Sequence, residues 1–270
     1  ENKGALTAGI KKIRRNKFAA NTTIPPSEVV AQQAILLYTH LFTGISNFIL
    51  NFNHYPFKLK LPEESVWVFP GQISFATQST LNDQYKLKKG HGGWDYKNGV
   101  IFNNEAMIDF FKNPASARMA SENAKNILEI ANQDCHHTAR LTLCSLAIQC
   151  FTMLFIANTG MNIAPLSQLE WETDNDFEIK KDAIQGFRAV KHRANGTIVE
   201  FHITSHFAPY FKQYLKLRKW ILQGIEAPLF FTLDKKRKPK MINASLAFKL
   251  RKKLEKFNIK VPSAREWRAY

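Results

Sequence analysis

The chain has 270 residues, of which 45% are hydrophobic and 12% aromatic, and it carries 38 Lys and Arg against 22 Asp and Glu. This apolar content is sufficient for a packed core and excludes a chain that is disordered throughout. The net charge of +16 attracts polyanions, so nucleic acid is the commonest class of partner and an anionic membrane surface is the alternative.

The N-terminal part predicts a basic arm and then a long helix. Residues 11–17 (KKIRRNK) show no apolar periodicity, so they form either a solvated tail or an arm that follows phosphates. Ser27 and Glu28 follow two prolines and indicate a helix start, after which apolar residues recur at helical spacing up to Ile49. The pattern then breaks into Pro, Gly and scattered aromatic residues. The glycines at 90–93 predict a flexible turn, since they lack the Lys-Ser/Thr of a phosphate loop.

Asn113-Pro114 marks a predicted boundary between an N-terminal helical domain, residues 1–113, and a second domain, residues 114–270. One helix is expected from Pro114 to about Ala131. Another is expected from Ala139 to Asn158, with Gly160 as its left-handed cap. The run LTLCSLAIQCFTMLFIA in this second helix is barely long enough to span a membrane, and no basic flank follows it. We expect a core helix that is apolar on all sides, and no membrane partner.

The cysteines and histidines predict no metal. Three cysteines leave one unpaired whichever two were joined, which favours the cytoplasm as the compartment. Cys135, His136 and His137 suggest a metal site, but adjacent ligands rarely point at one ion and no second pair with zinc-finger spacing follows. We therefore expect neither a metal nor another cofactor.

Short strands appear in the second half of the chain. One is expected at 177–179, and a hairpin is expected at 187–191 and 197–203 with Asn195-Gly196 at its tight turn. Ser205 is then expected to cap a helix that ends before Gly224.

Residues 235–270 are expected to be basic and mainly helical. A loop of five cations at 235–240 follows an apolar segment, and Asn243 is expected to start a helix that turns its leucines inward. Ser263 and Glu266 form a capping-box sequence at the start of one more helix. This order of elements predicts a mainly α fold with a small antiparallel β-sheet.

Three segments of residues 114–270 resemble the catalytic domain of tyrosine recombinases, the family of phage integrases. Residues 159–171 (TGMNIAPLSQLEW) are similar to the family's T-G-[LM]-R-I-x-E-L-x-x-L-x-W. The hairpin that contains Lys191 resembles the strand pair that carries the family's catalytic lysine. Residues 264–268 (AREWR) resemble the family's A-H-x-L-R at a helix start. The resemblance of residues 1–113 to the family's core-binding domain rests on position alone.

The resemblance implies a chemistry and assigns roles to four residues. In the family, a tyrosine attacks a DNA phosphodiester and forms a phosphotyrosine link, without a metal or nucleotide. Two arginines and a histidine hold the oxygens of the scissile phosphate, and a lysine protonates the leaving oxygen. Lys191 corresponds to that lysine and Arg268 to the second arginine. Arg265 stands where the histidine is usual, and Asn162 stands where the first arginine belongs.

Simpler interpretations remain open for the same residues. Asn162 is a favoured helix N-cap, and Pro165, where the family has an acidic residue, suits a first turn. Arg265 and Arg268 can belong to an ordinary basic helix start, and Lys191 can be an exposed hairpin lysine. The family's nucleophile lies a few tens of residues beyond the second arginine, so we expect it beyond Tyr270.

The resemblance implies a site-specific DNA recombinase that binds double-stranded DNA and self-associates on it. The alternative is a catalytically impaired, recombinase-like DNA-binding protein. A basic protein that binds RNA or a membrane surface explains the charge but not the ordered motifs. Twelve residues are expected to contact DNA: Lys11, Lys12, Arg14, Arg15, Lys17, His192, Arg193, Lys235, Lys236, Arg237, Lys238 and Lys240.

Overall fold

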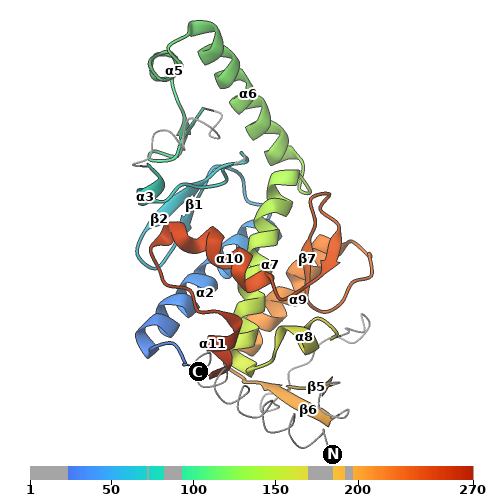
Figure 1. The fold of residues 1–270 in the computed structure, drawn as a ribbon. Coiled ribbons are helices and arrows are strands. Elements are labelled where there is room, and N and C mark those ends of the chain that lie inside the picture. The colour runs from blue at the N-terminus through green and yellow to red at the C-terminus, as the bar shows by residue number, and fades with distance from the viewer. Residues whose placement is uncertain (1–23, 72, 82–92, 170–184, 192–196, 270) are drawn as a thin grey trace, which may run out of the picture.

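The computed structural model describes residues 24–71, 73–81, 93–169, 185–191 and 197–269. Within these ranges the protein is mainly helical, with four two-stranded antiparallel sheets (Figure 1). The predicted fold class is therefore confirmed at the level of mainly α with small antiparallel sheets. The predicted basic arm at 11–17 and the predicted strand at 177–179 lie outside the described residues.

Helix α2 (Glu28–Leu50) confirms the first predicted helix. The Ser27 hydroxyl accepts a hydrogen bond from the Val30 N–H at 3.4 Å, which satisfies one of the free donors of the first turn. Apolar residues at helical spacing bury one face of α2, including Leu37, Leu41 and Ile45. The other face is exposed mainly in the first half of the helix and is partly buried in the second half.

Two small hairpins and a helical turn follow, where the sequence predicted only irregular structure. They are β1 (Phe57–Lys60) with β2 (Ser65–Val68), and β3 (Trp94–Asp95) with β4 (Val100–Ile101); α3 (Gln78–Leu81) lies between them. Strands of two to four residues are too short to show an alternating pattern. Aromatic packing holds them: the rings of Phe48 and Phe57 stack with centroids 3.7 Å apart, and those of Phe69 and Trp94 with centroids 5.0 Å apart.

Helices α5 (Asn104–Phe111) and α6 (Pro114–Gln133) pack against each other at one end of the molecule (Figure 1). The Asn113 side chain accepts hydrogen bonds from the N–H groups of Ala115 and Ser116 at 2.9 and 3.1 Å, and Pro114 occupies the first helical position. The predicted helix start at Pro114 is therefore confirmed.

Helix α7 (Thr138–Thr159) runs through the centre of the fold and buries sixteen of its 22 residues. Gly160 ends it in the left-handed conformation, with φ at 66°, as predicted. By length and composition alone, α2 and α7 could each cross a membrane. In this fold 78% of the most apolar window of α7 is buried, because helices and strands surround it on all sides.

The hairpin of β5 (Gln185–Lys191) and β6 (Thr197–Ile203) confirms the predicted strand pair, and Lys191 pairs with Thr197 at its described end. The expected Asn-Gly turn lies outside the described residues. Before the hairpin, α8 (Ile163–Leu166) is a single helical turn that contacts β5.

Helix α9 (Ala208–Leu222) begins later than predicted. The expected cap at Ser205 is wrong, because the Thr204 hydroxyl takes the hydrogen bond from the Phe207 N–H at 3.3 Å and the helix follows that turn. The helix ends at Gln223 in a left-handed conformation, directly before Gly224.

The C-terminal elements are the hairpin of β7 (Phe231–Leu233) and β8 (Pro239–Met241), helix α10 (Leu246–Leu254), the 3-10 turn η2 (Glu255–Phe257) and helix α11 (Ala264–Ala269). The predicted capping box is confirmed. The Ser263 N–H donates to Glu266 Oε2 at 2.6 Å, and the Glu266 N–H donates to Ser263 Oγ at 3.3 Å.

One hydrophobic core joins α2, α7, α9, β7, α10 and α11. Its centre is a stack of aromatic rings, in which Phe151 of α7 lies 4.8 Å from Phe42 and 4.3 Å from Tyr214 between ring centroids. Residues on both sides of the expected boundary at 113 contribute to this core. The division into two domains stays a prediction.

Candidate nucleic-acid interface

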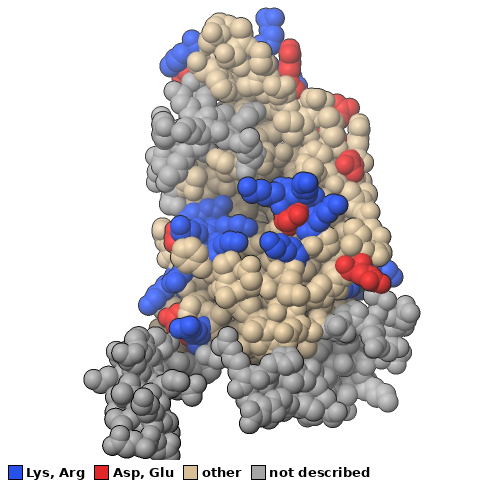
Figure 2. All heavy atoms as spheres, turned by 45° about the vertical axis from the view of Figure 1, so that its right-hand side comes forward, with Lys and Arg blue, Asp and Glu red and all other residues tan. Residues whose placement is uncertain are grey.

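A cluster of Lys and Arg covers the β7–β8 hairpin and α10. Between residues 234 and 260 the chain carries eleven Lys and Arg and only two acidic residues. Figure 2 shows basic side chains gathered over this face, with few acidic ones among them. We call the following nine residues the basic surface: Lys235, Lys236, Arg237, Lys238, Lys240, Lys249, Arg251, Lys252 and Lys253. All of them are exposed except Arg237, which is partly exposed.

The hairpin half of the basic surface is built around Asp234. Its carboxylate accepts hydrogen bonds from the backbone N–H groups of Lys236 and Lys238 at 2.7 and 2.9 Å. Its own N–H donates to the Lys238 carbonyl at 2.9 Å, and Arg237 adopts a left-handed conformation with φ at 62°. The nearest acidic group thus holds the shape of the loop through backbone bonds.

The helical half of the basic surface consists of Lys249, Arg251, Lys252 and Lys253, and the spacing of leucines in α10 explains its exposure. Leu246, Leu250 and Leu254 recur every four residues and are buried against the core. The intervening cations are therefore placed on the solvent face. These cations were not among the DNA-binding residues predicted from the sequence, although the leucine spacing that predicts the helix also predicts an exposed basic face.

Lys253 links the helical half to α7. Its ammonium group donates to Gln149 Oε1 at 3.1 Å, and the Gln149 amide donates to Ser145 Oγ at 3.2 Å. Gln149 is one of the few polar groups in the apolar run of α7. This hydrogen bond gives Gln149 a structural role, since it fixes the position of one cation of the basic surface.

The two halves of the basic surface are electrostatically coupled. Burial lowers the pKa of Lys253, Cys150 opposes this, and the nearby cations Arg237 and Lys249 lower the pKa further. Within the described part of the chain, no basic-surface side chain is ion-paired with Asp or Glu. The surface therefore presents uncompensated positive charge to solvent.

The predicted catalytic positions lie on α8, β5 and α11, which Figure 1 shows near one end of α7. Arg265 is exposed in the first turn of α11. The structure describes the strand that carries Lys191 and the helix that carries Arg268, but their side chains lie outside the described part. The gathering of the four residues in one cleft stays a prediction, as do the contacts of the basic arm and of His192 and Arg193.

Asn162 stands at the N-cap of α8, but its side chain makes no capping hydrogen bond. The expected capping bond is therefore wrong. A cap accepts from the N–H groups two or three positions on, and the third position here is Pro165, which has no N–H. Asn162 is partly exposed.

Basic residues also extend from α10 toward α11. Burial raises the pKa of Glu266, but hydrogen bonds with Ser263 and the cations Lys260 and Arg251 lower it more, so the net pKa lies below its ordinary value. Arg251 of the basic surface thus lies close to the helix start that carries Arg265. One positive region therefore reaches from the β7–β8 hairpin to α11.

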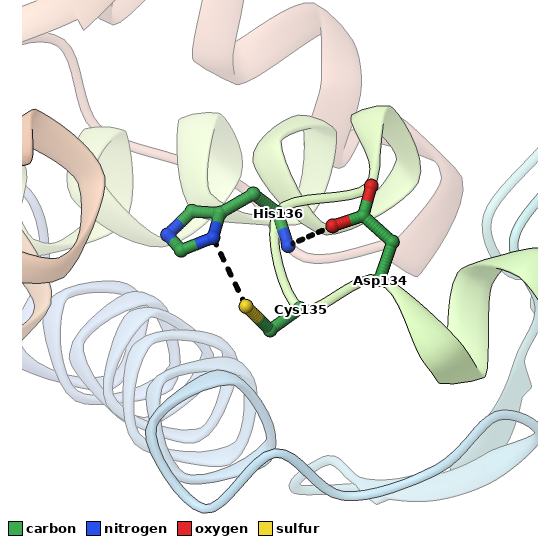
Figure 3. A group of neighbouring side chains, drawn as sticks. All are labelled: Asp134, Cys135 and His136. Carbon is green, nitrogen blue, oxygen red and sulfur yellow. Dashed lines mark hydrogen bonds between the residues drawn. The ribbon is translucent and has the colours of Figure 1, made fainter.

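Asp134, Cys135 and His136 form a small group in the connection before α7 (Figure 3). Their potential ligand atoms all lie within 4.8 Å of one another. Cys135 Sγ lies 3.0 Å from His136 Nδ1, and Asp134 Oδ1 accepts from the His136 N–H at 2.8 Å. The His136 ring stacks on Trp220 with centroids 4.5 Å apart. These contacts fix the connection between α6 and α7, so the group has a structural explanation.

Comparison with known proteins finds no matching family model, no matching curated protein and no matching solved structure. The residues and geometry of this chain therefore carry the functional proposal that follows.

Proposed function

We propose that this protein binds double-stranded DNA through the basic surface, as part of a tyrosine-type site-specific recombinase whose nucleophile lies beyond Tyr270. The observation that carries the proposal is the joining of a basic hairpin and a basic helix into one region that, among the residues the structure describes, forms no ion pair with an acidic side chain. Phosphates supply the compensating charge in such a complex, and each cation that contacts a phosphate releases a counterion.

The order of motifs supports the catalytic part of the proposal. In the proposed enzyme, Arg268 and Arg265 hold the non-bridging oxygens of the scissile phosphate, and Lys191 protonates the leaving 5′ oxygen. The attacking tyrosine hydroxyl forms a bond to phosphorus while the bond from phosphorus to the 5′ oxygen breaks. In the rejoining step a 5′ hydroxyl attacks the phosphorus of the phosphotyrosine, which restores a phosphodiester and releases the tyrosine.

A catalytically impaired DNA-binding protein is the second candidate, and Asn162 is the observation that favours it. An amide at this position donates one hydrogen bond but supplies no charge. Loss of a preorganised donor at a transition state costs on the order of 3 kcal/mol, roughly a hundredfold or more in rate. Binding through the basic surface is common to both candidates.

Binding to duplex DNA is expected to weaken steeply with salt. Replacement of the exposed hairpin residues Lys235 and Lys240 by Gln should lower affinity and reduce the slope of log affinity against log salt by about two, since two phosphate contacts are lost. Fluorescence anisotropy with a labelled duplex at several salt concentrations measures both quantities. The control is replacement of the exposed Lys97 and Lys125 by Gln, which removes the same charge outside the basic surface.

Undetectable or salt-independent duplex binding by the native chain would overturn the proposal. So would an equal loss of slope in the control variant, because the affinity would then reflect net charge alone. Tighter binding to anionic phospholipid vesicles than to duplex would favour a membrane-surface protein instead.

Lys191→Ala is expected to slow strand cleavage much more than it weakens binding. The test uses the reading frame extended beyond Tyr270, and it compares a normal duplex with one whose leaving oxygen is replaced by sulfur. Because sulfur leaves without protonation, the variant should regain most of its rate on the modified duplex. An equal loss on both substrates would show that Lys191 contacts backbone phosphate only.

A further inference from the structure

Phe248 is an exposed aromatic residue in the first turn of α10, directly before the cations of that helix. Its side chain is 56% exposed, and Lys249, Arg251 and Lys252 follow it on the same helix. Leucines make the contacts of α10 with the core, so the fold does not require Phe248. An exposed aromatic ring among cations matches the chemistry of a ligand that has both an apolar face and negative charge.

The ring of Phe248 is oriented by one of these cations. Lys252 lies one helical turn further on, and its Nζ is 5.2 Å from the ring centroid. This cation–π contact places a positive charge beside the aromatic ring. The arrangement offers a flat apolar surface and an adjacent group that binds phosphate.

A nucleotide is such a ligand, because it has an apolar base face and a negatively charged phosphate. In duplex DNA, however, each base is stacked between its neighbours and shows only its edge in the grooves. A phenylalanine ring stacks directly on an unpaired base, whereas a ring that enters a duplex must first pry two stacked base pairs apart at a cost of a few kcal/mol. The combination of charge and exposed ring therefore favours unpaired nucleotides as the ligand of this part of the surface.

We propose that Phe248 is a stacking platform for an unpaired base of single-stranded DNA, with Lys252 and Lys249 contacting the flanking phosphates. This inference rests on the proposed DNA-binding function and assigns one part of the basic surface to unpaired strand. Met241 of β8 provides a matched control, because it is an apolar residue of similar exposure, 55%, at the end of the basic hairpin.

The experiment compares the native chain with Phe248→Ala, Phe248→Trp and Met241→Ala, using labelled oligothymidylate and a labelled duplex. Phe248→Ala should bind oligothymidylate roughly 5- to 150-fold more weakly, the range for loss of one base–aromatic stack. Its duplex affinity should change less than twofold. The salt slope for oligothymidylate should stay the same, because stacking releases no counterions.

Phe248→Trp should retain affinity, and oligothymidylate should quench its additional tryptophan fluorescence, measured as the difference from the native chain. Circular dichroism confirms that each variant is folded. Unchanged oligothymidylate binding by Phe248→Ala would overturn the inference, as would an equal loss in Met241→Ala or an equal loss on duplex. Dependence of phosphatidylserine vesicle binding, and not of oligothymidylate binding, on Phe248 would also overturn it.

The same data separate this inference from the proposed function. Salt-dependent duplex binding with no effect of Phe248→Ala would overturn the stacking site and leave the function in place. No binding to oligothymidylate or to duplex at low salt would overturn both the stacking site and the proposed function.

Discussion

Arg140→Ala is expected to lower the free energy of unfolding by about 3–5 kcal/mol. Arg140 is fully buried, with 0% exposure. Its Nε donates to the Ala131 carbonyl at 3.1 Å and its Nη2 donates to the Asn53 carbonyl at 2.9 Å. Alanine would remove both hydrogen bonds and leave a cavity where the guanidinium lay.

Aromatic rings take the place of an acidic partner for this buried cation. The Arg140 guanidinium carbon lies 4.8, 4.6 and 5.1 Å from the ring centroids of Phe48, Phe52 and Tyr55. The negative faces of these rings stabilise the charge, although burial lowers the pKa of Arg140. Arg140→Lys should therefore recover only part of the loss, because an ammonium group has no planar fork to reach two carbonyls.

Urea unfolding of the native chain, Arg140→Ala and Arg140→Lys measures these effects. Arg118→Ala is the control, because Arg118 is exposed on α6 and its loss should cost less than about 0.5 kcal/mol. A loss below about 1 kcal/mol for Arg140→Ala would contradict the structural role of Arg140.

Lys256→Met is expected to stabilise the protein at neutral pH by up to about 3 kcal/mol. Burial lowers the pKa of Lys256 from 10.5 to about 8; Glu64 opposes this shift and Lys253 adds to it. The ammonium group lies 3.7 Å from the centroid of the Phe75 ring, a contact that favours the charge, but the lowered pKa means that the cost of burial is larger. The fold therefore disfavours the charged form that the unfolded chain keeps up to higher pH.

The sign of the pH dependence follows from the lowered pKa. Below about pH 8 the folded and unfolded chains both hold the proton, so the full cost of burying the charge is present. Between pH 8 and 10.5 the unfolded chain binds more protons, so the contribution of Lys256 to stability rises with pH. The advantage of Lys256→Met over the native chain should therefore shrink across this window.

Urea unfolding at pH 7 and at pH 10 measures the advantage, and Lys260→Met serves as the exposed control. The difference between variant and native chain removes the effect of other groups that titrate in the same range. A stability gap that is independent of pH would contradict the assignment.

Features set by local hydrogen bonds could be predicted from the sequence. Ser27, Asn113 and the Ser263–Glu266 pair all cap helices, because a cap needs only residues a few positions apart. The cap at Asn162 was wrong for an equally local reason, namely the missing N–H of Pro165. That error could have been avoided by counting the donors in the first turn.

Features set by contacts between distant segments could not be predicted. The β1–β2 and β3–β4 hairpins have strands too short to show a pattern, and they depend on ring contacts between separate segments, such as those of Phe48 with Phe57 and of Phe69 with Trp94. The basic hairpin was predicted as a DNA-binding loop, but its proximity to α10 depends on how both elements pack around α7. That proximity makes one surface from two basic segments.

The core joins segments from nearly opposite ends of the sequence, with a consequence for the order of folding. Tyr38 of α2 and Trp267 of α11 have ring centroids 6.4 Å apart, although more than two hundred residues separate them. Closing so long a loop costs chain entropy, and contacts of this range slow folding. During synthesis, α2 emerges from the ribosome long before α11. The apolar face of α2 must therefore wait for α7. The part of this face around Tyr38 must also wait for Trp267, so it is open to chaperones or to a second chain until translation has passed residue 267.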